Sequence, residues 1–153
     1  MPAELELEIS PVAASEYGEL LPLIAAYQRF YEVEEIDEER NHRFFRRFIA
    51  PSDAGLLLGA RGGGRLVGYA CLYWHFSSTE ARETVLMNDL FVVPEARGEG
   101  VGRALIEASL GVARERGALQ LEWQTAPDNR TAQRLYDTTG AARSSWLTYE
   151  LRA

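Results

Sequence analysis

A glycine-rich turn between an apolar run and an amphipathic segment most narrows the folds open to this chain. It lies within Leu90–Arg103 and places glycines at positions 98, 100 and 102. The residues before it favour a strand, and the helical periodicity that begins at Val101 predicts a helix. The first turn of such a helix has unpaired N–H groups and the positive end of the helix dipole, which together suit a phosphate. The stretch therefore predicts an anion-binding strand–loop–helix unit, with a merely flexible connection as the alternative.

Two familiar phosphate loops fit this stretch poorly. A P-loop requires Gly-Lys-Ser/Thr, and all 16 basic residues of this chain are arginine. A dinucleotide-binding Rossmann loop is the closer rival, because its glycine spacing is similar and Glu122 follows about 20 residues later. Rossmann glycines follow their strand directly, however, whereas Pro94–Arg97 intervene here. The chain also offers only one such unit, which counts against a Rossmann domain.

The order of the predicted elements indicates an α/β fold. A length of 153 residues suits one domain, and 46% hydrophobic with 25% charged residues is typical of globular proteins. Periodicity and turn signals predict the order β-α-α-β-β-β-α-β-α-β, a central mixed sheet flanked by helices in a single domain over 1–153. The predicted strands are Leu5–Ile9, Gly55–Arg61, Arg65–Phe76, Glu83–Val93, Ala118–Thr125 and Arg143–Leu151, and the predicted helices cover about 16–31, 37–50, 101–116 and 129–139.

Two motifs at the expected separation resemble those of the GNAT family of N-acetyltransferases. Arg97–Gly102 is similar to the family's Arg/Gln-x-x-Gly-x-Gly/Ala pyrophosphate loop, and Asp89–Glu95 before it is similar to the family's fourth strand. Asn129–Ala141 resembles the motif Asn-x-x-Ala-x-x-x-Tyr-x-x-x-Gly. The closest likeness within the family is to small-amine and polyamine acetyltransferases. The resemblance covers nearly the whole chain and implies a GNAT fold, in which strands four and five splay apart.

The resemblance implies acetyl-CoA as co-substrate, held in the gap between the splayed strands. The backbone of Phe91 and Val92 is expected to pair with the pantetheine arm, and Asn129 to hydrogen-bond to the same arm. Tyr136 is expected beside the thioester sulfur. The pyrophosphate is expected on the loop amides with arginine side chains nearby, and the residues concerned are Arg97, Gly98, Glu99, Gly100, Val101, Gly102 and Arg103.

Attack of an amine on a thioester needs an acid and a base. A phenol near the sulfur can protonate the leaving thiolate, so Tyr136 is the predicted general acid, although its helical face also suits a core position. The attacking ammonium has a pKa near 10 and must lose a proton. Polyamine acetyltransferases often carry Glu-Asp where this chain has Asn88 and Asp89, and an asparagine cannot accept a proton. Asp89 is the predicted base, with Glu122 (through a water) and His75 as alternatives.

Acidic residues are concentrated in the first third of the chain. The net charge is −7, and residues 1–50 contain 11 acidic residues against five arginines. In the GNAT fold the first two helices and their loop usually wall the acceptor pocket. There Tyr31, Glu32, Glu34 and Glu35 predict a site for a cationic amine, through charge and cation–π attraction. A solvated charge run is the alternative, and helical spacing favours a core position for Tyr27, Phe30 and Tyr31.

These residues together predict an N-acetyltransferase that moves an acetyl group from acetyl-CoA to a primary amine of a small cationic molecule, by direct attack in a ternary complex. Two other functions stay open. The first is an N-acetyltransferase whose acceptor is a protein or peptide amine. The second is a non-catalytic acetyl-CoA-binding regulatory module.

Several partners are not expected. The chain has no basic stripe for nucleic acid and no run of about 18 apolar residues for a membrane. His42 and His75 lie far apart without a spaced carboxylate, so no metal site is predicted. The first residues, 1–4, lack the features of a signal peptide, which predicts a cytoplasmic location. Dimers are common in the family, and Trp146 and Tyr149 of the last predicted strand are candidates for the pairing edge of a homodimer.

Overall fold

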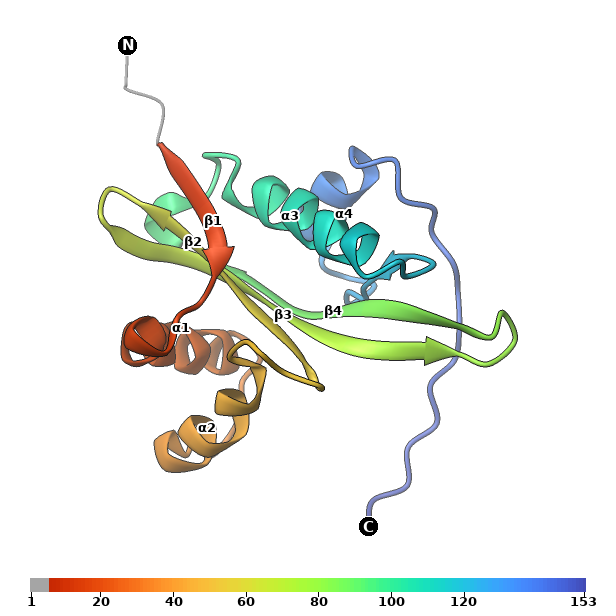
Figure 1. The fold of residues 1–153 in the computed structure, drawn as a ribbon, viewed down its shortest axis with the longest axis horizontal. Helices are drawn as coiled ribbons and strands as arrows, with labels where there is room; N and C mark the ends of the chain where they lie inside the picture. The colour runs from red at the N-terminus through yellow and green to blue at the C-terminus, as the bar shows by residue number, and fades with distance from the viewer. Residues whose placement is uncertain (1–5) are drawn as a thin grey trace.

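The predicted mixed sheet is present, and helices cover both of its faces (Figure 1). The computed structural model describes residues 6–153. The strand order is β1-β2-β3-β4-β5, antiparallel throughout except for the parallel pair β4–β5. The strands are β1 (Leu7–Pro11), β2 (Gly55–Gly62), β3 (Arg65–Ser77), β4 (Arg82–Val92) and β5 (Leu121–Glu122). The predicted fold class is confirmed.

The helices divide into two pairs, one on each face of the sheet (Figure 1). One pair is α1 (Tyr17–Phe30) and α2 (Glu38–Phe45), and the other is α3 (Val101–Glu115) and α4 (Arg130–Asp137). Short 3₁₀ turns cover Ala14–Glu16, Arg46–Phe48 and Pro94–Ala96. Asp37 caps α2, because its carboxylate accepts the backbone N–H of Arg40 at 2.9 Å. No helix within residues 6–153 is both long and apolar enough to cross a membrane.

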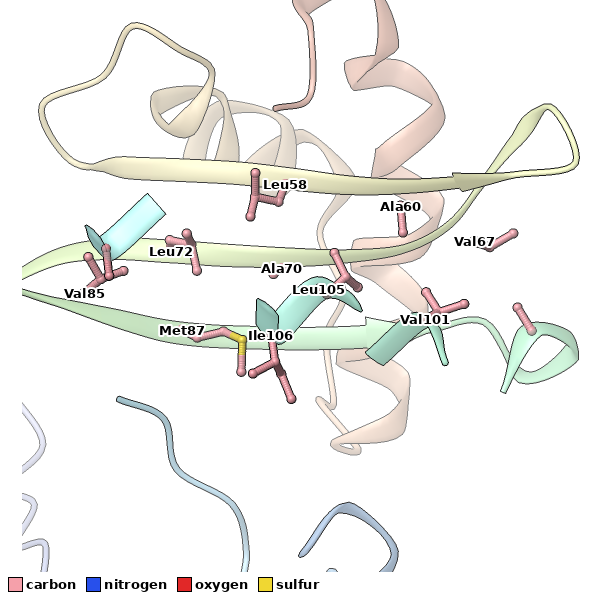
Figure 2. Close-up of a cluster of buried hydrophobic side chains, with 12 residues drawn as sticks. Leu58, Ala60, Val67, Ala70, Leu72, Val85, Met87, Val101, Leu105 and Ile106 are labelled. Carbon is pink, nitrogen blue, oxygen red and sulfur yellow. The ribbon is translucent and has the colours of Figure 1, made fainter. Parts of the chain in front are cut away.

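Alternation along the strands produces a hydrophobic cluster on each face of the sheet. On the α3 face, β-strand side chains such as Leu58 and Met87 pack with Val101 and Leu105 of the helix (Figure 2). On the α1 face, the cluster consists of Val12, Tyr17, Leu20, Ile24, Phe45, Phe48, Leu57, Leu66, Tyr69, Cys71 and Phe91. The two clusters pack one pair of helices against each face of the sheet. Cys71, in the second cluster, is a buried core residue.

Several predicted boundaries shift in the structure. The first strand runs from Leu7 to Pro11, and Leu5 lies outside the described residues. The helix predicted to end near position 50 ends at Phe45, where a 3₁₀ turn continues the chain. The strand predicted over Ala118–Thr125 is reduced to two residues, because the chain leaves β4 after Glu122 while β4 continues to Val92.

The predicted strand over Arg143–Leu151 is wrong for this structure. These residues form no regular secondary structure, and the side chains of residues 141–153 are exposed throughout. A strand exists only where a neighbouring strand accepts and donates its backbone hydrogen bonds. None of the strands within residues 6–153 pairs with this segment.

Candidate active site

The strands β4 and β5 separate after a short parallel contact. They pair only at Val85 with Leu121 and at Leu86 with Glu122. Beyond Leu86, the edge of β4 that faces away from β3 has no strand partner among residues 6–153. The expected splay between the fourth and fifth strands is therefore present, and it leaves a strand edge to which an extended chain can add.

The backbone groups that face this open edge follow from the pairing with β3. The Val93 N–H donates to the Val67 carbonyl at 2.9 Å, which makes these two residues a hydrogen-bonded pair. Since backbone groups alternate along a strand, those of Leu90 and Val92 point into the splay and those of Phe91 point towards β3. The N–H of Val92, a residue expected to pair with the pantetheine arm, thus has the required orientation, whereas the Val92 carbonyl already accepts a hydrogen bond from Arg97. Leu90 has it too, and the sequence alone did not indicate that residue.

The glycine-rich loop joins this open edge to the start of α3. Gly98 and Gly100 have φ values of 81° and 80°, a left-handed conformation that favours glycine. Gly100 is the N-cap of α3 and supplies no side-chain cap, so the N–H groups of Val101, Gly102 and Arg103 remain available. These donors and the helix dipole fit the pyrophosphate of coenzyme A.

The third glycine of the loop has a different role. A Cβ built on Gly102 would lie 3.1 Å from Leu135 Cδ2 of α4. The absence of a side chain at Gly102 therefore allows α4 to approach the first turn of α3. The first turn of α3 thus packs against the helix that carries Tyr136.

The two loop arginines are held by neighbouring groups. The Arg97 Nε–H donates to the Val92 carbonyl at 3.0 Å, and its guanidinium lies 5.9 Å from the centre of the Phe91 ring. Arg103 donates to the Thr138 hydroxyl at the end of α4. Glu99 and Arg97 are exposed. Both predicted arginines thus lie at the loop, and both also brace it against other elements.

Replacing Gly100 with alanine tests the loop. The positive φ disfavours alanine by about 1 kcal/mol or more, and the added Cβ stands among the free N–H groups. We expect acetyl-CoA affinity to fall at least about tenfold in isothermal titration calorimetry, equivalent to about 1.4 kcal/mol. Gly111→Ala is the matched control, since Gly111 lies inside α3 with open space around it. The affinity of this variant for acetyl-CoA should equal that of the wild type. Equal affinities in the two variants would contradict the assignment.

Asn129 occupies the N-cap of α4. Its Oδ1 accepts the Ala132 N–H at 3.2 Å, and this leaves the amide Nδ2 for another partner. Gln133, which the sequence did not single out, fixes the loop before α4 by donating to the carbonyls of Ala126 and Pro127. In the sequence, the sign of this role is that Gln133 stands in the first turns of the predicted helix, within reach of the loop before it. Both side chains fix the loop of residues 126–129 to the first turn of α4.

Tyr136 lies on α4 against the end of β5. Its ring meets that of Trp123 edge to face, with 5.5 Å between the centroids. Burial raises the pKa of Tyr136, and the nearby Tyr31 raises this pKa further. The phenol therefore keeps its proton at neutral pH and is available as a donor.

A β-bulge directs Asp89 towards the α1 face. Cys71 of β3 pairs with Asp89 and the next residue, Leu72, pairs with Met87, so Asn88 is the extra residue. Without it, simple alternation would turn Asp89 to the side of Met87, under α3. The Asp89 side chain is only 4% exposed. The bulge therefore places this carboxylate on the face of the sheet that α1 covers.

The surroundings of Asp89 change its ionisation. Burial raises the pKa of Asp89 to about 6, although hydrogen bonds from Asn88 and Tyr69 oppose this rise. The Asn88 Nδ2–H donates to one carboxylate oxygen at 2.8 Å, and the Tyr69 hydroxyl lies 3.5 Å from the other. Asn88, which cannot itself accept a proton, thus positions the neighbour that can.

Aromatic side chains at the C-terminal end of α1 lie near Asp89. Tyr27 stands 4.9 Å from Tyr31 and 6.1 Å from Tyr69, between ring centroids. Burial raises the pKa of Tyr27, and Asp89, Tyr31 and Tyr136 add to this increase. The structure therefore gathers these side chains at the mouth of the splay. Phe30 and Tyr31 are 57% and 50% exposed, so the expectation that the α1 aromatics are all core residues is wrong.

The acidic loop follows α1 directly. Glu32 adopts a left-handed φ of 56° and ends the helix in a Schellman motif, in which the Val33 N–H reaches the Gln28 carbonyl at 3.1 Å. Glu34 and Glu35 are exposed. Tyr31, just before this loop, lies near enough to Tyr136 to raise its pKa. The three glutamates lie on the outer surface of the loop.

The alternative bases lie next to each other. His75 Nδ1 is 3.4 Å from Glu122 Oε1, and Gln120 donates to the other oxygen of Glu122 at 2.8 Å. Both side chains are partly exposed at the closed end of the splay, whereas Asp89 is three residues beyond the last β4–β5 pair.

No group of three metal-ligating side chains is found within residues 6–153. A shallow groove between β1–β3 and the end of α3 contains none of the candidate residues.

Comparisons with known proteins agree with this arrangement. The model of the acetyltransferase (GNAT) family matches residues 20–141. An uncharacterized N-acetyltransferase of Bacillus subtilis is 32% identical over 134 residues, which cover 88% of this chain and 89% of the relative. The thialysine N-epsilon-acetyltransferase of Sus scrofa is 31% identical over 137 residues, 81% of this chain and 77% of the relative.

A solved structure shares the fold. An aminoglycoside N-acetyltransferase in complex with CoA superposes with a TM-score of 0.83 at 16% identity, covering 99% of this chain and 98% of that one. Fold and site define a coenzyme A-dependent acyltransferase. The chain belongs to the acetyltransferase (GNAT) family, and it is an N-acetyltransferase that uses acetyl-CoA as its co-substrate.

Proposed function

We propose that residues 1–153 act as one domain that acetylates a primary amine of a small cationic molecule by direct attack in a ternary complex. Asp89 is the general base and Tyr136 the general acid. The acceptor enters from the side of α1 and its acidic loop. The observation that carries the proposal is a buried carboxylate, with a pKa of about 6, among tyrosines at the mouth of the splay.

The properties of Asp89 support its role as base. A carboxylate with a pKa near 6 is ionised at neutral pH and accepts a proton more readily than an ordinary aspartate. The tyrosine hydroxyls around it offer a polar path for a proton from the amine. Asn88 holds the carboxylate in one orientation through its 2.8 Å hydrogen bond.

The cofactor side supports Tyr136 as acid. Leu90 and Val92 would hold the pantetheine arm by backbone hydrogen bonds, with Asn129 as a further partner. The amides of residues 97–102, with Arg97 and Arg103, would bind the pyrophosphate. Tyr136 would then donate its proton to the sulfur as the carbon–sulfur bond breaks, while Asp89 takes the proton that the amine loses. Acid and base are thus separate groups on α4 and β4.

The acidic loop and one relative support a small cationic acceptor. Tyr31 contacts Tyr27 and raises the pKa of Tyr136, and the exposed Glu32, Glu34 and Glu35 follow Tyr31 in the same loop. A cation near these groups gains charge attraction and cation–π contact. The Sus scrofa relative is named for acetylation of the ε-nitrogen of thialysine, an amine of this kind.

A thiol-release assay with acetyl-CoA tests the proposal. The acceptor panel contains thialysine, lysine, D-amino acids, spermidine, aminoglycosides and peptides with a free α-amine. We expect turnover of at least one small amine at micromolar to millimolar KM. Turnover of peptides alone would favour a protein or peptide acetyltransferase. Cofactor binding without turnover of any amine would favour a non-catalytic module, and either result would overturn the proposal.

The double substitution Glu34→Gln/Glu35→Gln tests the acidic loop. Each exposed charge contributes about 0.5 kcal/mol to attraction of a cation, so we expect KM for the amine to rise about threefold to fivefold with kcat unchanged. The effect should shrink at high salt, because exposed charges are screened. Glu80→Gln and Glu107→Gln, at exposed positions elsewhere, are the controls. An unchanged KM in low salt would show that these carboxylates are only solvated.

A further inference from the structure

Polar side chains of adjacent strands gather on the face of the sheet opposite α3. Val85 of β4 and Leu121 of β5 pack into the cluster under α3. Because side chains alternate along a strand, Thr84, Gln120 and Glu122 lie on the opposite face, which α1 and α2 cover in part.

The strand β3 adds His75 to the same face. Its neighbour Trp74 belongs to the cluster under α3, whereas Tyr73 stacks on Phe48 of the α1 cluster, with 5.2 Å between the ring centroids. His75 shares the face of Tyr73 by alternation, and it pairs with Thr84 across the ladder. The side chains that make up this polar row are His75, Thr84, Gln120 and Glu122.

Contacts within the polar row leave groups available to a ligand. His75 Nδ1 lies 3.4 Å from Glu122 Oε1, and the Gln120 amide donates to Glu122 Oε2 at 2.8 Å. Figure 1 shows β3 and β4 continuing beyond α1 and α2 towards their common turn. The side chains of His75 and Glu122 are accordingly 54% and 37% exposed, so a ligand can reach both.

Thr84 differs from the rest of the row because it is buried. It is 2% exposed, and its hydroxyl has no hydrogen-bond partner among residues 6–153. Buried polar side chains are nearly always hydrogen-bonded, so an unpaired hydroxyl beside His75 indicates a polar ligand group at this position.

The polar row lies within the length of one small molecule from Asp89. Cys71 pairs with Asp89, and Tyr73, two residues further along β3, pairs with Leu86, which in turn pairs with Glu122. Two residues correspond to a rise of about 7 Å along the sheet. A chain of about four methylene groups spans such a distance. The half-buried Tyr73 and Leu86 provide an apolar floor for this chain.

The chemistry of the polar row suits the head group of an α-amino acid. Glu122 is an acceptor for an ammonium, whereas the His75 imidazole and the Thr84 hydroxyl can donate to a carboxylate. The second ammonium of a plain diamine would also meet Glu122, but it offers no acceptor to the imidazole or the hydroxyl.

We propose that the polar row binds the α-ammonium and the carboxylate of an amino acid whose side-chain amine is acetylated beside Asp89. The proposal rests on the proposed function, since it concerns the far end of the same acceptor. Glu122 binds the α-ammonium, and His75 and Thr84 bind the carboxylate. The methylene chain of the acceptor lies across the apolar floor. Glu122 and His75 thereby determine specificity and are not the base.

Three acceptors that differ by one group test the proposal in the thiol-release assay. Cadaverine is lysine without the carboxylate, and 6-aminohexanoate is lysine without the α-ammonium. We expect kcat/KM for lysine to exceed that for each of the others at least about tenfold, as loss of a charge-assisted hydrogen bond implies. Equal values for lysine and cadaverine would overturn the proposal.

The same assay separates failure of this proposal from failure of the proposed function. Acetylation of another small amine without acetylation of lysine would overturn the amino-acid head group and leave the proposed function intact. Absence of turnover with every amine would overturn both.

Substitutions in the polar row separate the two halves of the head-group site. In Glu122→Gln, the ratio of kcat/KM for lysine to that for 6-aminohexanoate should fall at least about fivefold. In His75→Gln and in Thr84→Val, the ratio for lysine to cadaverine should fall in the same way. Glu107→Gln, at an exposed position on α3, is the matched control and should keep both ratios.

Calorimetry with acetyl-CoA shows that each variant is folded, since the cofactor site is separate from the polar row and its affinity should equal that of the wild type. Unchanged acceptor ratios in folded Glu122→Gln would overturn the proposal. An equal loss of kcat with all three acceptors in this variant would identify Glu122 as a general base, and this result would overturn the proposal as well.

Discussion

Substituting Asp89 with asparagine is expected to lower kcat at least about 100-fold and, at neutral pH, to make the protein more stable. General base catalysis by a positioned side chain contributes about 10²- to 10⁴-fold, and asparagine cannot accept the proton. In the wild type, kcat/KM should rise with pH through an apparent pKa near 6, as the Asp89 carboxyl ionises. Asn88, which donates to this carboxylate, should retain its hydrogen bond in the variant, since the amide oxygen also accepts.

The gain in stability follows from the raised pKa. Burial raises the pKa of Asp89 to about 6, against about 3.9 in an unfolded chain. The folded protein therefore holds this proton more tightly, and the free energy of unfolding falls as the pH rises from about 4 to about 6. A difference of about two pKa units corresponds to about 2–3 kcal/mol at neutral pH. The Asp89→Asn variant avoids the burial of a charge and should recover this amount.

Urea denaturation at pH 4 and pH 7, together with steady-state kinetics, measures both effects. The variant should exceed the wild type in stability at pH 7 and match it near pH 4. Asp128→Asn, at an exposed position, should change neither property. Retained activity in Asp89→Asn would exclude Asp89 as the base and leave Glu122 and His75, which contact each other at 3.4 Å.

Tyr136→Phe is expected to lower kcat at least about tenfold, with acetyl-CoA affinity changed by less than about twofold. The phenylalanine retains the edge-to-face contact with Trp123 and loses only the hydroxyl that would protonate the leaving thiolate. Since burial raises the pKa of Tyr136, this hydroxyl is protonated across the working pH range of the base. We therefore expect kcat of the variant to be lower than that of the wild type at every pH from 6 to 9.

Kinetics and calorimetry with acetyl-CoA separate turnover from binding in this variant. Tyr149→Phe is a suitable control, because the substitution removes the same atom from an exposed tyrosine outside the proposed site. Near-normal turnover in Tyr136→Phe would leave Tyr136 as a packing residue. A large fall in affinity would instead indicate a role in binding the cofactor.

The anion-binding loop could be predicted in detail because its constraints are local. Three glycines between an apolar run and a helical period define a left-handed turn at a helix N-terminus, whatever surrounds it. The structure adds a distinction that spacing does not show. Gly98 and Gly100 allow the left-handed backbone conformation of the loop. Gly102 instead leaves space for the side chain of Leu135 of α4.

The environment of the predicted base could not be derived in the same way. Strand alternation would place Asp89 under α3, and only the bulge at Asn88 turns it towards Tyr69 and Tyr27. A bulge depends on the pairing of two strands, so it leaves no clear trace in either one. The same holds for the capping bond of Asn129 and for the contact between His75 and Glu122.

The sequence by itself thus determined the order of elements, the glycine loop and the strand-like character of residues 143–151, because each depends on neighbours in the chain. Only the tertiary structure decided which way Asp89 points, which backbone groups of β4 are free, and whether the last segment has a partner. Those properties depend on hydrogen bonds and packing between segments that are distant in the chain. The C-terminal residues make the difference plain, since their pattern is that of a strand while the described chain supplies no strand beside them.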